Sequence, residues 1–311
     1  MAPASSSPAA SGRSLLWLVA IGFFMQTLDA TIVNTALPAM AASLGESPLR
    51  MQSVVVAYSL TMARLIPASG WIADRFGTRR VYLLAIALFA LGSLLCAISQ
   101  SLGALVASRV VQGLGGALLM PVGRLAVLRA FPREQFLRAM GFIAIPGLIG
   151  PLMGPSLGGW LVEVASWHWI FLINLPVALL GAAMSMLFMP AGRVPPPGAF
   201  DLSGFLLLSG GMVAVSLSFV GVSELGLRHA TVVVLMVFGL VSLAAYWLHA
   251  LRHPAPLFLP SLFSVASLRV GLLGNLFARL GSSCMPFLVP LLMQVSMRYS
   301  PAQAGMMMLP M

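Results

Sequence analysis

The stretch GLIGPLMGPSLGG, Gly147–Gly159, places glycines and prolines inside an apolar segment that is long enough to cross a membrane. In the interior of a water-exposed helix a glycine costs about 1 kcal/mol and a proline about 3 kcal/mol. In lipid, by contrast, small residues at i and i+4 let two helix backbones approach closely. Gly150, Gly154 and Gly158 have this spacing. The stretch therefore predicts a transmembrane helix, bent by its prolines, that packs tightly against a neighbour.

The composition of the whole chain also indicates a membrane protein. Of the 311 residues, 59% are hydrophobic and only 8% are charged, which is more apolar surface than one soluble core absorbs. Apolar segments bounded by charge, proline or glycine lie roughly at 15–38, 50–73, 81–99, 103–128, 137–164, 167–189, 202–222, 231–249 and 268–295, with a tenth from about 301. We therefore expect an all-α, polytopic membrane protein whose first partner is the lipid bilayer.

The net charge of +10 would favour nucleic acid as a partner if the chain were soluble. The arginines instead gather in short loops between apolar segments, as the positive-inside rule predicts, so we expect no nucleic-acid partner. A cytoplasmic N-terminus puts nine of them in cytoplasmic loops, namely Arg13, Arg75, Arg79, Arg80, Arg129, Arg133, Arg138, Arg193 and Arg252. Only Arg50, Arg228 and Arg298 then lie outside.

The first segment carries an aspartate near the middle of the membrane, in LDATIVNTALP, 28–38. A rise of about 1.5 Å per residue puts Asp29 roughly 21 Å from the inner boundary and Arg109 roughly 9 Å below the outer one. These depths agree in a hydrocarbon core of about 30 Å, so the two side chains are predicted to pair. The pair is either purely structural or a site where protonation of Asp29 competes with substrate binding.

Two further motifs lie on neighbouring segments. RVVQGLGGA, 109–117, places Gln112 one turn beyond Arg109. GWIADRFGTRR, 70–80, is predicted as the loop between the second and third helices, with a tight turn at Gly77 and an acidic side chain, Asp74, among arginines.

In order along the chain, LDxTIVNxALP, GxxADRxGxR, RxxQGxGGA and GxxxGPxxGG resemble four signatures of the major facilitator superfamily. The match is to its fourteen-helix drug:proton antiporter branch, the EmrB/QacA-like group. The resemblance implies two six-helix bundles with two extra helices between them. It also implies alternating access and proton-driven export of hydrophobic or cationic compounds, with the proton gradient in place of any cofactor, across a bacterial inner membrane.

By position, the resemblance assigns roles to the residues of these motifs. Proton coupling falls to Asp29 and Arg109, and candidates for the substrate cavity are Asn34 and Gln112. The cytoplasmic gate comprises Gly70, Asp74, Arg75, Gly77, Arg79 and Arg80, and the antiporter helix comprises Gly150, Gly154, Pro155, Gly158 and Gly159.

The resemblance also predicts the domain organisation. We expect a cytoplasmic tail at 1–14, the first bundle at 15–190, a proline-rich linker with two extra helices at 191–251, and a cytoplasmic linker with an incomplete second bundle at 252–311. The family would place about four more helices after Met311. The chain by itself is therefore expected not to transport, with Asp29 and Arg109 on an inner wall that lacks its facing half.

Three alternatives remain open from the sequence. The chain is a major facilitator that carries a metabolite as symporter or exporter, a truncated fragment without transport activity, or an intramembrane enzyme. With seven acidic residues and four histidines, no paired-carboxylate, metal-ligand or nucleophile–base pattern is visible, so no catalytic or metal site is predicted and an enzyme is not expected.

The arginine distribution gives a testable topology. Reporter fusions at Gly77 and Ser101 are expected to give opposite signals, cytoplasmic at Gly77 and external at Ser101, because one membrane crossing separates them. Signals of the same kind at both positions would contradict this topology.

Overall fold

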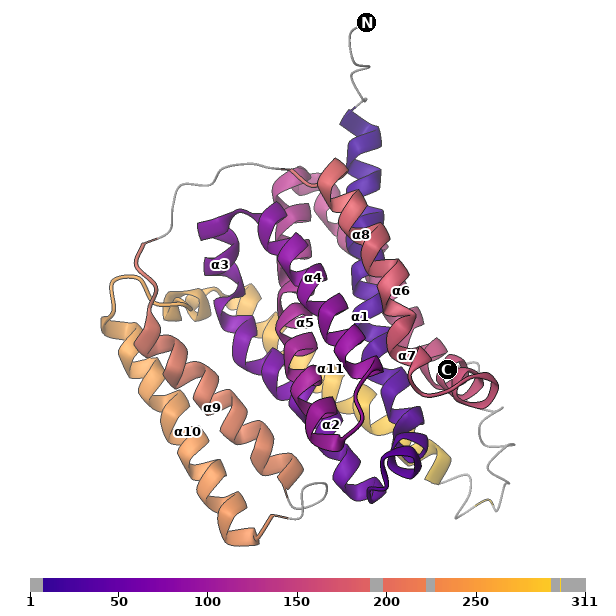
Figure 1. Cartoon of the computed structure of the whole chain (residues 1–311). Helices are drawn as coiled ribbons and strands as arrows, with labels where there is room; N and C mark the ends of the chain where they lie inside the picture. Colours follow the sequence, from indigo (N-terminus) through magenta and orange to yellow (C-terminus); the bar gives the residue numbers. More distant parts are fainter. Residues whose placement is uncertain (1–7, 191–197, 222–226, 292–296, 298–311) are drawn as a thin grey trace, which may run out of the picture. The chain divides into compact units, whose positions relative to one another are not determined.

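Helices make up every regular element that the computed structural model describes, at residues 8–190, 198–221, 227–291 and 297. The chain divides into two compact units, Met1–Phe258 and Leu259–Met311. In order, the first unit contains α1 Pro8–Leu44, α2 Pro48–Leu65, the 3-10 helix η1 Ile66–Ala68, α3 Ser69–Phe76, α4 Thr78–Ala97, α5 Leu102–Ala130, α6 Arg133–Val164, α7 Trp169–Leu172, α8 Asn174–Phe188, α9 Leu202–Gly221 and α10 His229–Arg252 (Figure 1). The second contains η2 Pro260–Ser264 and α11 Ala266–Leu291, which contact each other.

The predicted apolar segments correspond to these helices, and the tenth, from about residue 301, lies outside the described residues. Among the described residues, seven stretches are long and apolar enough to cross a membrane: Gly12–Leu44, Thr78–Ala97, Leu102–Ala130, Arg133–Val164, Trp169–Phe188, Leu202–Gly221 and His229–Arg252. The segment expected at 50–73 is interrupted. Helix α2 ends at Leu65, and Pro67 lies in the 3-10 turn before α3 begins.

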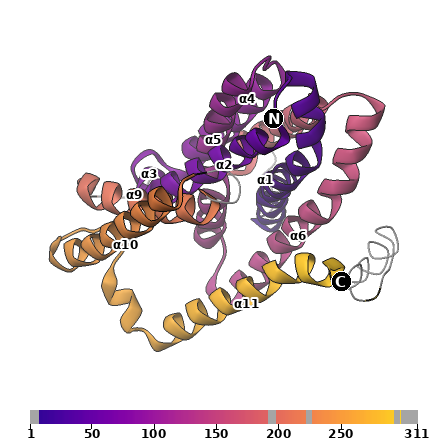
Figure 2. The same ribbon diagram turned by 90° about the horizontal axis from the view of Figure 1, so that it is seen from below.

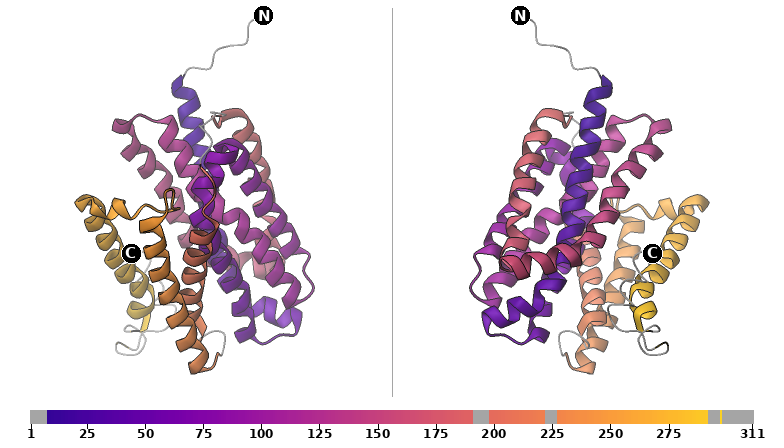
Figure 3. Two further views of the ribbon diagram at one scale, coloured as in Figure 1. Left: turned by 90° about the vertical axis from the view of Figure 1, so that its left-hand side faces the viewer. Right: turned by 90° about the vertical axis from the view of Figure 1, so that its right-hand side faces the viewer.

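Helix α1 packs along α6, and these two helices share a very close contact (Figure 3). The glycines of the GxxxGPxxGG stretch face α1. A Cβ atom added at Gly150 would lie 2.3 Å from Thr27 Oγ1, and one at Gly154 would lie 2.2 Å from Thr31 Oγ1. At Gly158 it would lie 3.1 Å from the Ile32 carbonyl oxygen. Side chains other than hydrogen at these positions would force the helices apart.

Glycines also bring α4 and α5 together, in the group of helices that Figure 2 views end-on. A Cβ at Gly92 of α4 would lie 2.4 Å from the Gln112 backbone nitrogen, and one at Gly115 of α5 would lie 2.4 Å from the Phe89 nitrogen. Helix α2 packs on the other side of α5. Asp29 of α1, Ser93 of α4 and Gln112 of α5 are thereby held deep inside the first unit.

Helices α9 and α10 form a pair that packs against α2 through α9 (Figure 1). They cross at Gly211 and Gly239, where an added Cβ on either glycine would approach the carbonyl oxygen of the other to 3.1 or 3.0 Å. Asp201 starts α9, because its carboxylate accepts a hydrogen bond from the Gly204 amide at 2.8 Å.

Because α6 packs closely on α1, large side chains are expected to lower the stability of the protein only at those positions of α6 that face α1. Gly154→Leu and Gly158→Leu are expected to destabilise the protein by about 1–3 kcal/mol or more, because a leucine overlaps atoms of α1. Gly210→Leu is the matched control, since no atom lies within 4 Å of an added Cβ there. Thermal unfolding of the purified protein in detergent measures the three variants. Equal melting temperatures would show that α6 makes no special contact.

Candidate functional site

The predicted pairing of Asp29 with Arg109 is present in the structure. Asp29 comes from α1 and Arg109 from α5, and a guanidinium nitrogen of Arg109 lies 2.7 Å from Asp29 Oδ2. Both residues are only 1% exposed. A buried ion pair of this kind is costly to desolvate, so each charge needs further hydrogen bonds to be tolerated.

Two side-chain amides supply those hydrogen bonds to Asp29. Gln112 Nε2 donates to Asp29 Oδ1 at 2.9 Å, and Asn174 Nδ2 of α8 donates to the same oxygen at 3.1 Å. Both amides also donate to Ser93 Oγ of α4, at 2.8 and 3.3 Å. The carboxylate therefore joins four helices, α1, α4, α5 and α8, in one network. We call Asp29, Ser93, Arg109, Gln112 and Asn174 the central network.

The rest of the Arg109 guanidinium is enclosed by protein groups. It donates to the Gln112 side-chain oxygen and, through Nε at 3.4 Å, to the Val54 carbonyl oxygen of α2. Its Cζ lies 4.4 Å from the centre of the Tyr58 ring and 5.6 Å from that of Phe171. Aromatic faces attract a cation most strongly where water is excluded, so these rings offset part of the cost of burying the charge.

This burial corrects one expectation. The sequence placed Asp29 and Arg109 on an open inner wall, but both side chains are closed inside the first unit. The sequence also missed Ser93 and Asn174. Asn174 lies two residues before Pro176 in an apolar stretch, WIFLINLP, 169–176, where an uncharged polar residue at a helix start is the only available signal.

The two substrate-cavity candidates lie in different surroundings. Gln112 is fully buried in the central network, whereas Asn34 is exposed on α1. Neither lines the cleft of about 590 Å³ between α1, α5 and α6. That cleft is lined mainly by apolar side chains together with Arg124, whose Cζ lies 5.6 Å from the centre of the Phe23 ring. Phe23 itself packs against Gly147 of α6.

The predicted gate is partly helical rather than a loop. Gly70 belongs to α3, and the turn is confined to Gly77, whose φ of 86° favours glycine. Asp74 pairs with Arg129 at the end of α5, a partner that the sequence did not single out. Arg79 of α4 donates to the Met186 carbonyl oxygen at the end of α8. Arg75 and Arg80 are exposed.

A search against protein families matches residues 19–311 to the family described as Major Facilitator Superfamily. Two bacterial relatives carry the name putative multidrug resistance protein MdtD. The protein of Serratia proteamaculans is 56% identical over 97% of this chain and 63% of its own length, and that of Pectobacterium carotovorum is 55% identical over 97% and 65%. The chain thus spans just under two thirds of these relatives.

Solved structures share the fold at low sequence identity. The POT family transporter PepTSo aligns with a TM-score of 0.54 at 16% identity, over 78% of this chain and 52% of its own. The human organic anion transporter MFSD10 aligns with a TM-score of 0.52 at 18% identity, over 68% and 56%. These alignments support the arrangement of helices and nothing more specific.

The enclosure of the central ion pair predicts a large stability effect. Arg109→Ala is expected to cost about 3–5 kcal/mol, because it leaves the Asp29 carboxylate buried without its counter-charge. The control is Arg50→Ala, which breaks the exposed pair with Glu46 and is expected to cost about 0–1 kcal/mol. Unfolding in detergent compares the two variants, and equal losses would mean that burial adds nothing to the central pair.

Proposed function

The chain belongs to the Major Facilitator Superfamily, and we propose that it forms the first bundle and the extra helices of a proton-coupled multidrug efflux antiporter. Its relatives named for multidrug resistance, at 55–56% identity, support this class of transporter. The proposed setting is a bacterial inner membrane, with the N-terminus in the cytoplasm. Export would use the proton gradient and no cofactor.

The observation that carries the proposal is the Asp29 carboxylate enclosed with Arg109 in the membrane-spanning region. A proton that binds Asp29 cancels its charge and removes its ion pair with Arg109. Arg109 then keeps a buried positive charge without a counter-charge, which is unfavourable in this surrounding. Protonation therefore favours a rearrangement of α1 against α5, and deprotonation favours the arrangement seen here.

The cleft between α1, α5 and α6 is the proposed substrate site. Its lining is mostly apolar, which suits hydrophobic compounds. Phe23, in this lining, lies six residues before Asp29 on α1, about 9 Å along the helix axis. A movement of α1 on protonation would therefore shift a wall of the cleft. The shift would also reach α6, which forms another wall of the cleft, because Gly147 of α6 packs on Phe23.

A second candidate is the export of an anionic metabolite. Among the described residues that line the cleft, Arg124 is the single charged one and none carries a carboxylate. An arginine in an apolar surrounding attracts anions and repels cations. Charge at the cleft thus favours neutral or anionic substrates over cationic ones.

Transport by a chimera tests the proposal, with residues 1–311 in place of the corresponding part of the Serratia relative. Inverted vesicles containing the chimera are expected to accumulate ethidium, a lipophilic cation, or carboxyfluorescein, an anion, when a proton gradient is imposed. Asp29→Asn is expected to abolish this uptake at unchanged protein level, since the side chain no longer binds and releases a proton. Wild-type rates in Asp29→Asn, with unchanged pH dependence, would remove Asp29 from the mechanism.

Arg124→Gln separates the two candidate substrate classes. Loss of carboxyfluorescein transport with retained ethidium transport would assign anion recognition to Arg124. Loss of neither would mean that Arg124 does not select the substrate by its charge.

A further inference from the structure

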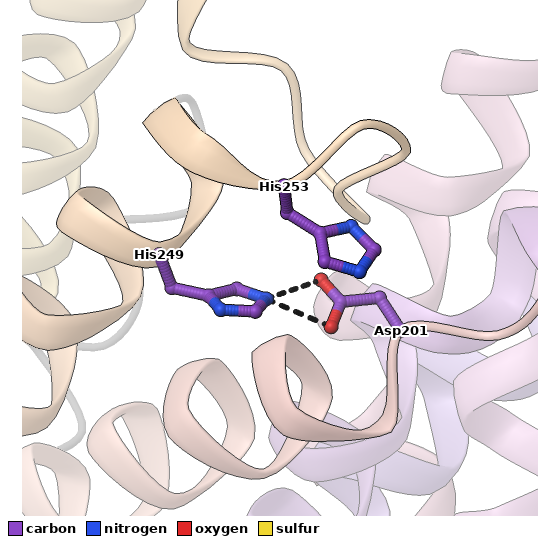
Figure 4. A group of neighbouring side chains, drawn as sticks. All are labelled: Asp201, His249 and His253. Carbon is purple, nitrogen blue, oxygen red and sulfur yellow. Dashed lines mark hydrogen bonds and ion pairs between the residues drawn. The ribbon is translucent and has the colours of Figure 1, made fainter.

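Three potential metal ligands meet where α9 begins and α10 ends. Asp201 precedes α9, His249 lies in the last turn of α10, and His253 follows that helix directly (Figure 4). One ligand atom from each residue lies within 4.8 Å of the others. No part of the central network or of the apolar cleft is involved. We call these three residues the linker cluster.

The carboxylate of the linker cluster is fixed in place. Asp201 is only 3% exposed, and its Oδ1 accepts hydrogen bonds from the Gly204 amide at 2.8 Å and the Ser203 hydroxyl at 3.1 Å. These hydrogen bonds fix the direction of the carboxylate, which is therefore an oriented oxygen ligand, as metal sites require.

The two imidazoles are placed by the end of α10. Spacing of i and i+4 puts His249 and His253 on one side of the helix, and their rings stack with centres 4.9 Å apart. His249 Nε2 lies 2.9 and 3.1 Å from the two oxygens of Asp201. Tyr246 of α10 fixes the segment that follows His253. Its hydroxyl accepts a hydrogen bond from the Phe258 amide at 2.8 Å and donates one to the Phe258 carbonyl oxygen at 3.2 Å.

We propose that Asp201, His249 and His253 bind a divalent transition metal ion, with Zn²⁺ as the ion that fits best. Two imidazoles and one carboxylate are a common set of three protein ligands for Zn²⁺, with the fourth position open to water. Imidazole nitrogen also suits Cu²⁺ and Ni²⁺, whereas Mg²⁺ and Ca²⁺ prefer oxygen alone. Each imidazole binds as the neutral ring, with no proton on the nitrogen that faces the ion.

A bound ion would join the start of α9, the end of α10 and the segment after it. Without an ion, the start of α9 and the end of α10 are joined by the contact between His249, which is half-buried, and Asp201, which is buried. Metal binding would thus stabilise the α9–α10 pair. The inference is independent of the proposed transport, because it concerns residues outside both the central network and the cleft.

Zinc binding to the purified 311-residue chain tests this inference. The protein carries an affinity tag without histidines, and a chromophoric chelator competes for Zn²⁺. We expect one bound Zn²⁺ per chain and a rise in melting temperature with Zn²⁺ concentration. His249→Ala and His253→Ala are each expected to weaken binding by more than about tenfold, since even loss of an outer-shell partner costs about 10- to 100-fold.

His229→Ala is the matched control, because His229 lies at the opposite end of the same helix and is exposed. It is expected to bind Zn²⁺ like the unchanged chain. Circular dichroism checks that all variants keep their helix content, and Asp201 is left in place because it caps α9. Absence of saturable Zn²⁺ binding by the unchanged chain, or equal binding by all variants, would overturn the proposal.

Discussion

The ion pair between Asp29 and Arg109 constrains the first unit, because two opposite charges are enclosed among its helices and are each only 1% exposed. Neither charge is tolerable alone at that depth. Each must keep the other, and Asp29 must also keep the hydrogen bonds that it accepts from Gln112 and Asn174. Both of these amides donate to Ser93 as well. The network thereby fixes the relative positions of α1, α4, α5 and α8. Protonation or deprotonation of Asp29 therefore alters contacts that involve all four helices.

Close backbone packing makes this network possible. Gly92 and Gly115 bring α4 and α5 together where Gln112 lies, and Gly150 and Gly154 hold α1 on α6 next to the turn that carries Asp29. Hydrophobic burial drives little association in lipid, so such contacts and buried polar bonds carry much of the specificity. The glycine-rich helix and the charged pair are thus two parts of one arrangement, since α1 belongs to both.

Much of this arrangement follows from the sequence, and the rest depends on tertiary contacts. Apolar length and helical rise predict the helices and the shared depth of Asp29 and Arg109. They do not tell whether a polar side chain faces a cavity or the bundle interior, so the burial of Gln112 was not foreseen. The contacts of Asn174 with Asp29 and of His249 with Asp201 join residues that are far apart in the chain. No local sequence pattern marks either contact.

The proposed coupling of transport to protons depends most directly on the protonation state of Asp29 during substrate binding. Infrared difference spectra of the chimera, recorded with and without a transported dye, detect the C=O stretch of a protonated carboxyl group. Dye binding is expected to change this band, and Asp29→Asn is expected to remove the change while the protein remains folded. A spectrum without a carboxyl band, or one that is the same in Asp29→Asn, would contradict the role of the buried pair in coupling.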